Sequence, residues 1–90
     1  MAILIHEVWE ETGERGEILP GLCEAGPNGD GFRKLLAPGA QLVHTLEAGS
    51  YFEAMTIYYR FYGWGDYTTE FAIDYEPYPE EWADRQRRGR

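Results

Sequence analysis

Three residues in this chain are of the types that form a nucleophile–base pair or a soft metal site: Cys23, His6 and His44. A catalytic thiolate needs an imidazole beside it and an electropositive setting. Cys23 is followed by Glu24 in an acidic chain, which raises the pKa of a thiol, and CxxC and HxxxH spacings are both missing. We therefore predict no catalytic residue, no metal site and no cofactor, with an enzyme that pairs Cys23 and His44 as an alternative.

Paired carboxylates are the second candidate chemistry. Glu10 and Glu11 are adjacent, as are Glu80 and Glu81. Such acids serve general acid–base catalysis when one of them is buried. Adjacent acids at a strand end or in the first turn of a helix normally face water, and the spacing selects no pair across a cleft. An enzyme with a buried carboxylate is the second form of the same alternative.

The segment GPNGDG, residues 26 to 31, superficially resembles a phosphate-binding loop. It has neither the lysine and hydroxyl residue of a P-loop nor the GxGxxG spacing of a dinucleotide-binding turn. Its single carboxylate is too few for a calcium site. We predict a plain turn, with Asp30 capping one turn of helix before Pro38.

Trp64 lies between Gly63 and Gly65 and directly before Asp66 and Tyr67. With little bulk beside it, the indole can present a face to a sugar, a base or a proline-rich peptide. The competing interpretation is that the glycines end a helix while Trp64 fills the core. We take an aromatic patch as the candidate binding site, and it comprises Tyr58, Tyr62, Trp64, Asp66 and Tyr67.

The formal charge of the 90 residues is −8, but it is unevenly distributed. Residues 85 to 90 hold four of the eight basic side chains and none of the sixteen acidic ones, so residues 1 to 84 carry −12. A strongly negative body repels phosphate backbones, which excludes nucleic-acid binding by the body and favours a cationic or proline-containing protein partner. We predict one domain over 1–84 and a basic disordered tail over 85–90.

The start of the chain, MAILIHEVWE, has no basic leader and an apolar run of only four residues, so we expect neither a signal peptide nor a membrane anchor. No apolar stretch approaches the roughly 20 residues that span a bilayer. With a single cysteine, the chain cannot form an internal disulfide. We therefore expect a cytoplasmic protein.

Period-two alternation predicts strands at residues 2 to 9, 40 to 47 and 67 to 73, the last being the clearest, with a short additional strand near 18 to 24. In the first of these, Ile3, Ile5 and Trp9 share one face. Ser50 and Glu53 form a capping box that starts a helix at 50 to 62, which Gly63 ends. The competing prediction for this segment is a strand, because residues 56 to 59 have high β propensity. Proline followed by acids after Tyr78 predicts a short C-terminal helix.

The helix at 50 to 62 has too few polar residues for an ordinary surface helix, since Glu53, Thr56 and Arg60 form one narrow polar stripe. The rest of it is apolar or aromatic. Tyr75, Tyr78 and Trp82 can fold back over it, or a homodimer or foreign partner can cover it. The acidic, aromatic and proline-rich run 74 to 82 either docks on this helix or is recognised as a peptide.

The sequence thus predicts an α+β fold: a small antiparallel sheet of about three strands packed against one aromatic-rich helix, with a short C-terminal helix. For function we favour a non-catalytic protein-binding or adaptor module with an aromatic patch in an acidic surface. A small enzyme and a structural homodimer are the alternatives.

Overall fold

A computed structural model describes residues 2–89 and confirms the α+β fold. Three antiparallel strands form one sheet in the order β2-β1-β3. The strands are β1 (Leu4–Thr12), β2 (Ile18–Glu24) and β3 (Gln41–Ala48). The helices are α1 (Asp30–Arg33), α2 (Tyr51–Tyr62) and α3 (Glu80–Gly89), with 3₁₀ turns η1 (Pro27–Gly29) and η2 (Ala72–Tyr75).

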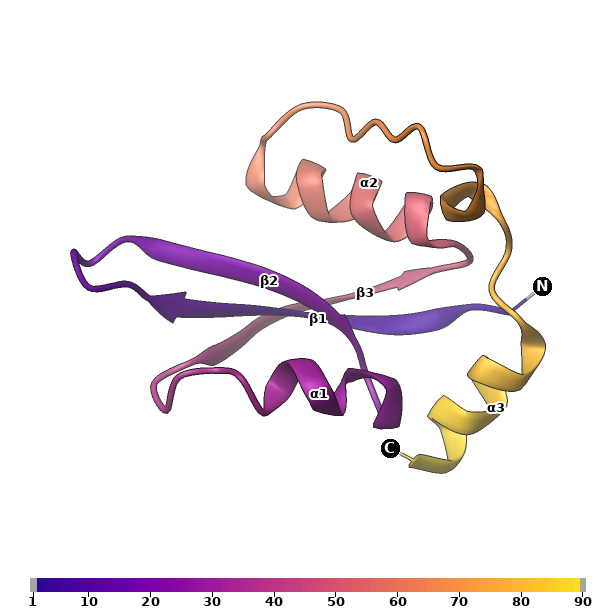
Figure 1. Ribbon diagram of the computed structural model, residues 1–90, viewed down its shortest axis with the longest axis horizontal. Coiled ribbons are helices and arrows are strands. Elements are labelled where there is room, and N and C mark those ends of the chain that lie inside the picture. Colours follow the sequence, from indigo (N-terminus) through magenta and orange to yellow (C-terminus); the bar gives the residue numbers. More distant parts are fainter. Residues whose placement is uncertain (1, 90) are drawn as a thin grey trace.

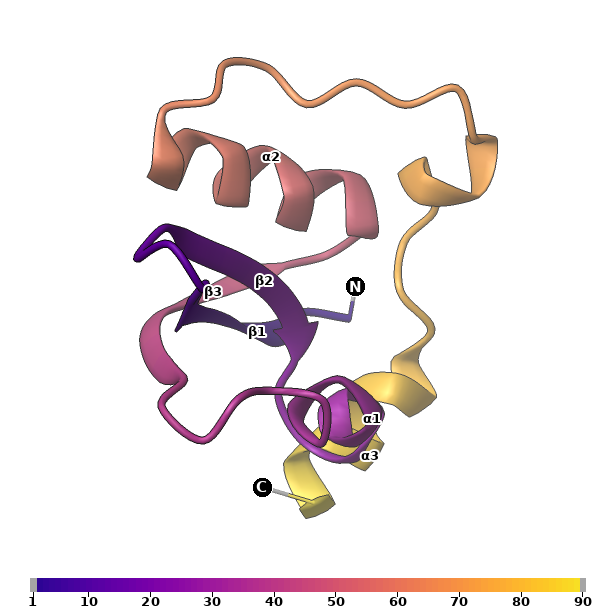
Figure 2. The ribbon, with the colours of Figure 1, turned by 60° about the vertical axis from the view of Figure 1, so that its left-hand side comes forward.

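The sheet lies between two helices (Figure 1). Helix α2 covers one face and the short α1 lies below the other, while α3 packs beside the end of the sheet where the chain starts (Figure 2). Leu4 and Val8 of the central strand are fully buried: Val8 packs with Ala54 and Tyr58 of α2, and Leu4 packs with Tyr78 and with Ala83 of α3. Ile3 is 48% exposed, so the core uses the face opposite to the Ile3, Ile5 and Trp9 row.

Helix α2 begins and ends where the sequence predicts. The Ser50 hydroxyl accepts a hydrogen bond from the amide of Glu53 at 3.1 Å. The Glu53 carboxylate accepts from the amide of Gly49 at 2.6 Å, one residue before the amide expected from the capping box. Gly63 takes the left-handed conformation at φ +70°, which a residue without a Cβ adopts at little cost.

The strand predicted at 67 to 73 is wrong, because this segment crosses α2 without pairing to the sheet. Its polar side chains bond locally instead. The Thr69 hydroxyl donates to the Asp74 carboxylate at 2.8 Å and accepts from the amide of Phe71 at 3.2 Å. Such side-chain bonds compete with a sheet ladder, and here they lead into the 3₁₀ turn η2.

The sheet has β2 in place of the predicted strand at 67 to 73. For β2 the sequence predicted only a short additional strand. Pro20 lacks an amide donor and is tolerated because β2 is at an edge of the sheet. The turn after it is confirmed, with one correction: Gly29 is the N-cap of α1, and Asp30 is already helical.

The predicted C-terminal helix is present, and it runs further than expected. Residues 85 to 89, which we predicted to be a disordered tail, belong to α3, while Arg90 lies outside the described residues. The reason is Gln86, which is 6% exposed and binds main-chain groups of the sheet. Its amide donates to the carbonyls of Ile5 (2.8 Å) and Ala25 (2.9 Å), and its Oε1 accepts from the amide of Ile5 (2.8 Å).

Within residues 2–89, no helix is both long and apolar enough to cross a membrane.

Candidate functional site

Most rings of the aromatic patch predicted from sequence pack against other residues of the same chain. Tyr58 is 6% exposed and lies in the core with Val8 and Leu46. The Tyr62 hydroxyl donates to Glu10 at 2.6 Å, and burial together with this carboxylate raises the pKa of Tyr62. Trp64 stacks on Tyr62 with ring centroids 4.8 Å apart and stays half exposed.

The other two residues of the patch, Tyr67 and Asp66, have different surroundings. Tyr67 packs on Phe52 and Tyr59 of α2, with centroids 5.9 and 5.2 Å away. Asp66 is exposed. Tyr75 stacks on Phe52 at 4.5 Å, so much of the aromatic surface of α2 is covered from within the chain. Tyr78 and Trp82 pack instead with Ala2, Leu4 and Ala83 at the end of the sheet.

Beside Tyr78 lies a buried histidine, His6, which the sequence analysis named only as a residue type able to act as a base or a metal ligand. His6 is 2% exposed, its Nδ1 is 3.2 Å from the Leu4 carbonyl, and its Nε2 is 2.9 Å from the Tyr78 hydroxyl. A carbonyl only accepts, so Nδ1 carries the proton and Nε2 of the neutral ring accepts from the hydroxyl. Burial lowers the pKa of His6 to about 4, which keeps the ring neutral at pH 7.

The other side of Tyr78 faces a pocket of about 400 Å³ between α2, the η2 segment and the start of α3. We call it the aromatic–acidic pocket. Its lining combines three large rings with three carboxylates, and none of the described residues that line it is basic. These residues are Tyr51, Tyr78 and Trp82, and Glu24, Asp74 and Glu76.

The pocket has a proline-rich wall, and the carboxylates in it with a hydrogen-bond donor accept from neutral side chains. Pro77 and Pro79 also line it, and each fixes φ near −65°. Ser50 and Pro77 form an isolated bridge that ties the segment to the start of α2. Asp74 accepts from Thr69, and Glu24 accepts from Asn28, so both carboxylates have neutral donors rather than cations.

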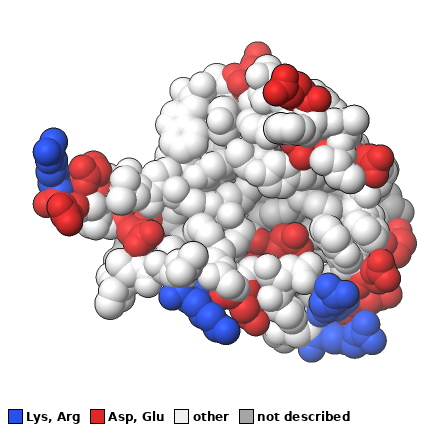
Figure 3. Space-filling view, viewed as in Figure 1, with Lys and Arg blue, Asp and Glu red and all other residues white. Residues whose placement is uncertain are grey.

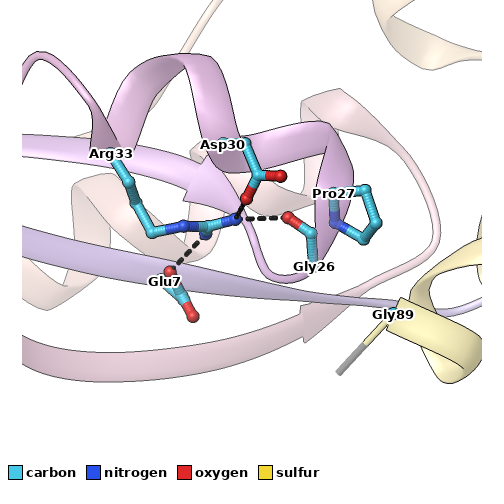
Figure 4. Close-up of a pocket in the computed structure, with 6 residues that line it drawn as sticks. All are labelled: Glu7, Gly26, Pro27, Asp30, Arg33 and Gly89. Carbon is cyan, nitrogen blue, oxygen red and sulfur yellow. Dashed lines mark hydrogen bonds and ion pairs between the residues drawn. The ribbon is translucent and has the colours of Figure 1, made fainter.

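A second pocket lies on the opposite side of the sheet, beside α1 (Figure 4). We call it the arginine pocket. Nη1 of Arg33 contacts the Glu7 carboxylate at 2.7 Å and the Glu24 carbonyl at 3.1 Å. Nη2 contacts the Asp30 carboxylate at 2.8 Å and the Gly26 carbonyl. This guanidinium is committed to the chain itself, so it binds α1 to the sheet and is not free to hold an anion.

Cys23 and His44, the predicted alternative catalytic pair, are not brought together. Cys23 pairs with Glu7 and His44 with Val8, and adjacent residues of a strand point to opposite faces of a sheet. Burial, followed by the Glu7 charge, raises the pKa of the Cys23 thiol to about 11. His44 stacks on Phe61 at 4.5 Å. This geometry gives no support to thiol catalysis.

Among residues 2–89, no group of three or more histidine, cysteine or acidic side chains is arranged to hold a metal ion. Comparison with protein family models finds no match, and searches of curated proteins and of solved structures find none either.

One clue to the aromatic–acidic pocket was visible in the sequence. The run 74 to 82 supplies most of its lining and stood out as a mixture of acids, aromatics and prolines. Glu24 and Tyr51 could not have been added to it from sequence, because they come from distant elements that only the fold brings together.

Proposed function

We propose that this chain is a non-catalytic binding module whose aromatic–acidic pocket takes a cationic side chain of a partner protein. The observation that carries the proposal is the lining: aromatic rings and carboxylates line one pocket, and none of the described residues that line it is basic. A cation over an aromatic face is attracted by the ring, and the attraction strengthens as water is excluded. The carboxylates add charge pairing.

The charge of the whole chain supports the same class of partner. With a net charge of −8, the protein attracts a basic partner over a longer range. On the face shown in Figure 3, acidic side chains lie over the upper and right-hand parts, near the centre and at the left-hand projection, and basic ones lie along the lower side and at that projection. As part of the proposal we place the module in the cytoplasm, where a lone thiol stays reduced.

The predicted aromatic patch belongs to the proposal as a secondary contact. Trp64, at 49%, is the most exposed of its rings, and its exposed part can contact a proline or an arginine of the same partner.

A peptide titration followed by NMR tests the proposal. The probe is a short peptide with one arginine between prolines, and its control has glutamine in place of the arginine. We expect amide shifts from residues 74 to 82 with the arginine peptide only. Glu76→Gln should weaken binding about fivefold, on the scale of one partly exposed charge pair.

The matched control is Glu14→Gln, which makes the same charge change at the turn between β1 and β2, far from the pocket (Figure 1). It should leave the affinity unchanged. Equal binding of the two peptides, or equal loss in both variants, would refute a cation-specific pocket.

A further inference from the structure

The 3₁₀ turn η2 borders the aromatic–acidic pocket and leaves large apolar side chains in water. Ile73 of this turn lines the pocket and is 68% exposed, and Tyr51, which also lines it, is 43% exposed. Phe71 and Tyr75, two residues before and after Ile73, are 63% and 53% exposed. Figures 1 and 2 both show η2 beside the start of α2, where Tyr51 lies. We call these four residues the apolar rim.

The apolar rim is held in place by contacts within the chain. The amide of Asp74 donates to the carbonyl of Phe71 at 3.1 Å, which closes the turn that contains Ile73. The ring of Tyr75 stacks on Phe52 of α2. A surface that is already ordered loses little conformational entropy when a partner binds. Exposed apolar groups of this kind are a usual mark of an interaction site.

The charge around the apolar rim selects the class of partner. Residues 61 to 84 contain seven acidic side chains and no lysine or arginine. Three of these acids, Glu70, Asp74 and Glu76, are interspersed with the residues of the rim. Such a surface repels the same surface of a second copy and repels anionic lipid, because each brings like charges together. It attracts a segment in which cations and apolar side chains lie side by side.

We propose that the apolar rim takes a large aliphatic side chain of the same partner segment whose cation enters the aromatic–acidic pocket. The partner is then a basic amphipathic segment and not a basic segment of polar residues. This inference rests on the proposed function, since the cation fixes where the aliphatic side chain falls. Ile73 belongs both to the pocket and to the rim, so the cation and the aliphatic group lie on the same side of the partner segment.

Contact with the apolar rim adds affinity that charge alone does not supply. An exposed charge pair contributes little, because water and salt screen it. Burial of about half of a leucine side chain is on the scale of a tenfold gain in affinity. The cation therefore sets the position of the segment, and the aliphatic contact supplies most of the added affinity.

Four peptides measure the two contacts separately. Each has a central arginine or glutamine between prolines, and either leucine or alanine three residues away on both sides, as in Leu-Pro-Pro-Arg-Pro-Pro-Leu. A proline-rich peptide has three residues per turn, so the leucines lie on the same side as the central residue. In an NMR titration, leucine should improve the affinity of the arginine peptide about tenfold over alanine. The amides of residues 71 to 75 should shift more with the leucine peptide.

A substitution in the rim should remove this gain. Ile73→Gln takes away the exposed aliphatic group at the pocket and should reduce the advantage of leucine over alanine to less than about threefold. Ile18→Gln is the matched control, because Ile18 is 55% exposed at the start of β2, away from η2 (Figure 1). It should leave the tenfold advantage unchanged. Circular dichroism checks that both variants are folded.

The four affinities also keep this inference apart from the proposed function. If the arginine peptides bind equally with leucine and with alanine, the aliphatic contact is refuted and the cationic pocket stands. If leucine improves binding but arginine and glutamine bind alike, the cation-specific pocket is refuted, and the inference fails with it. Shifts of residues 71 to 75 that depend on the concentration of the free protein would assign the rim to a second copy and overturn the inference.

An equal loss of the leucine advantage in Ile73→Gln and Ile18→Gln would also overturn it, because the gain would then not depend on the apolar rim.

Discussion

The two pockets of this protein both contain carboxylates, and they differ in whether the chain itself supplies a cation that pairs with them. In the arginine pocket, Glu7 and Asp30 are paired by Arg33 from the same chain. In the aromatic–acidic pocket, Glu24, Asp74 and Glu76 lie among rings and no described basic residue lines the site. The first set of carboxylates already has its cation and stabilises the fold, whereas the lack of a described cation in the second set is the basis of the proposed binding of a cationic partner.

The same contrast extends to the groups behind each pocket. Glu7 also accepts from the Trp9 indole at 2.9 Å, so the arginine pocket is built on charge-assisted bonds. The aromatic–acidic pocket is supported by the neutral pair of His6 and Tyr78. The first network stabilises the fold through ions, and the second depends on a ring that must remain uncharged.

Acidification should therefore weaken the support of the aromatic–acidic pocket most. The unfolded histidine takes up a proton near pH 6.5, whereas folded His6 does so only near pH 4. Its contribution is fully present above about pH 6.5 and is lost as the pH falls toward 4. We expect a loss of about 3 kcal/mol in the free energy of unfolding between pH 7 and pH 4.

The control for this prediction is His6→Gln, whose amide accepts from Tyr78 and does not titrate. Urea unfolding of both proteins across this pH range separates His6 from the carboxylates, which titrate in both. Parallel pH profiles for the two proteins would show that His6 is not protonated differently on folding.

Removing the cation of the arginine pocket should have the next largest effect. Arg33→Met keeps the apolar stem but leaves Glu7, whose side chain is 16% exposed, without its charged partner. We expect a loss of about 2 kcal/mol, the scale of hydrogen bonds to a charged group. Chemical denaturation at pH 7 measures it.

Arg87→Met is the matched control, because Arg87 pairs with Asp84 on the surface of α3, with both side chains more than half exposed. Exposed pairs contribute little, so the change should stay below about 0.5 kcal/mol. If the two variants lose equal stability, the arginine pocket has no special structural role.

Local signals carried most of what the sequence revealed about the fold. Ser50, Glu53 and Gly63 define α2 through bonds within a few residues, and the structure reproduces both ends of the helix. The alternation at 67 to 73 led to the wrong prediction of a strand, because alternation indicates an extended chain and not its pairing with a sheet. Whether such a chain joins a sheet depends on an available edge, which is a property of the whole fold.

The site was harder to predict for the same reason. The unusual composition of residues 74 to 82 was visible, but no local pattern shows that Glu24 and Tyr51 join them or that His6 is buried against Tyr78. Nor could sequence place Cys23 and His44 on opposite faces, since that follows from the register of β1 with both neighbours. Pairing between distant elements decides each of these points.

The finest test of the comparison is the same substitution made in both pockets. Glu7→Gln removes a charge that Arg33 and Trp9 both bind, and it should cost about 1 kcal/mol of stability. Glu76→Gln removes a charge from a group of like charges, so its effect should be zero or a gain of a few tenths of a kcal/mol.

Salt sharpens this last difference. Added salt screens repulsion between exposed charges, so a gain from Glu76→Gln should shrink as ionic strength rises. The loss from Glu7→Gln should persist, because that contact is partly buried. Denaturation of both variants at low and high salt measures the contrast. A Glu76→Gln variant as destabilised as Glu7→Gln would mean that both sets of carboxylates stabilise the fold, and the pocket beside Trp82 would then have no unpaired charge for a partner.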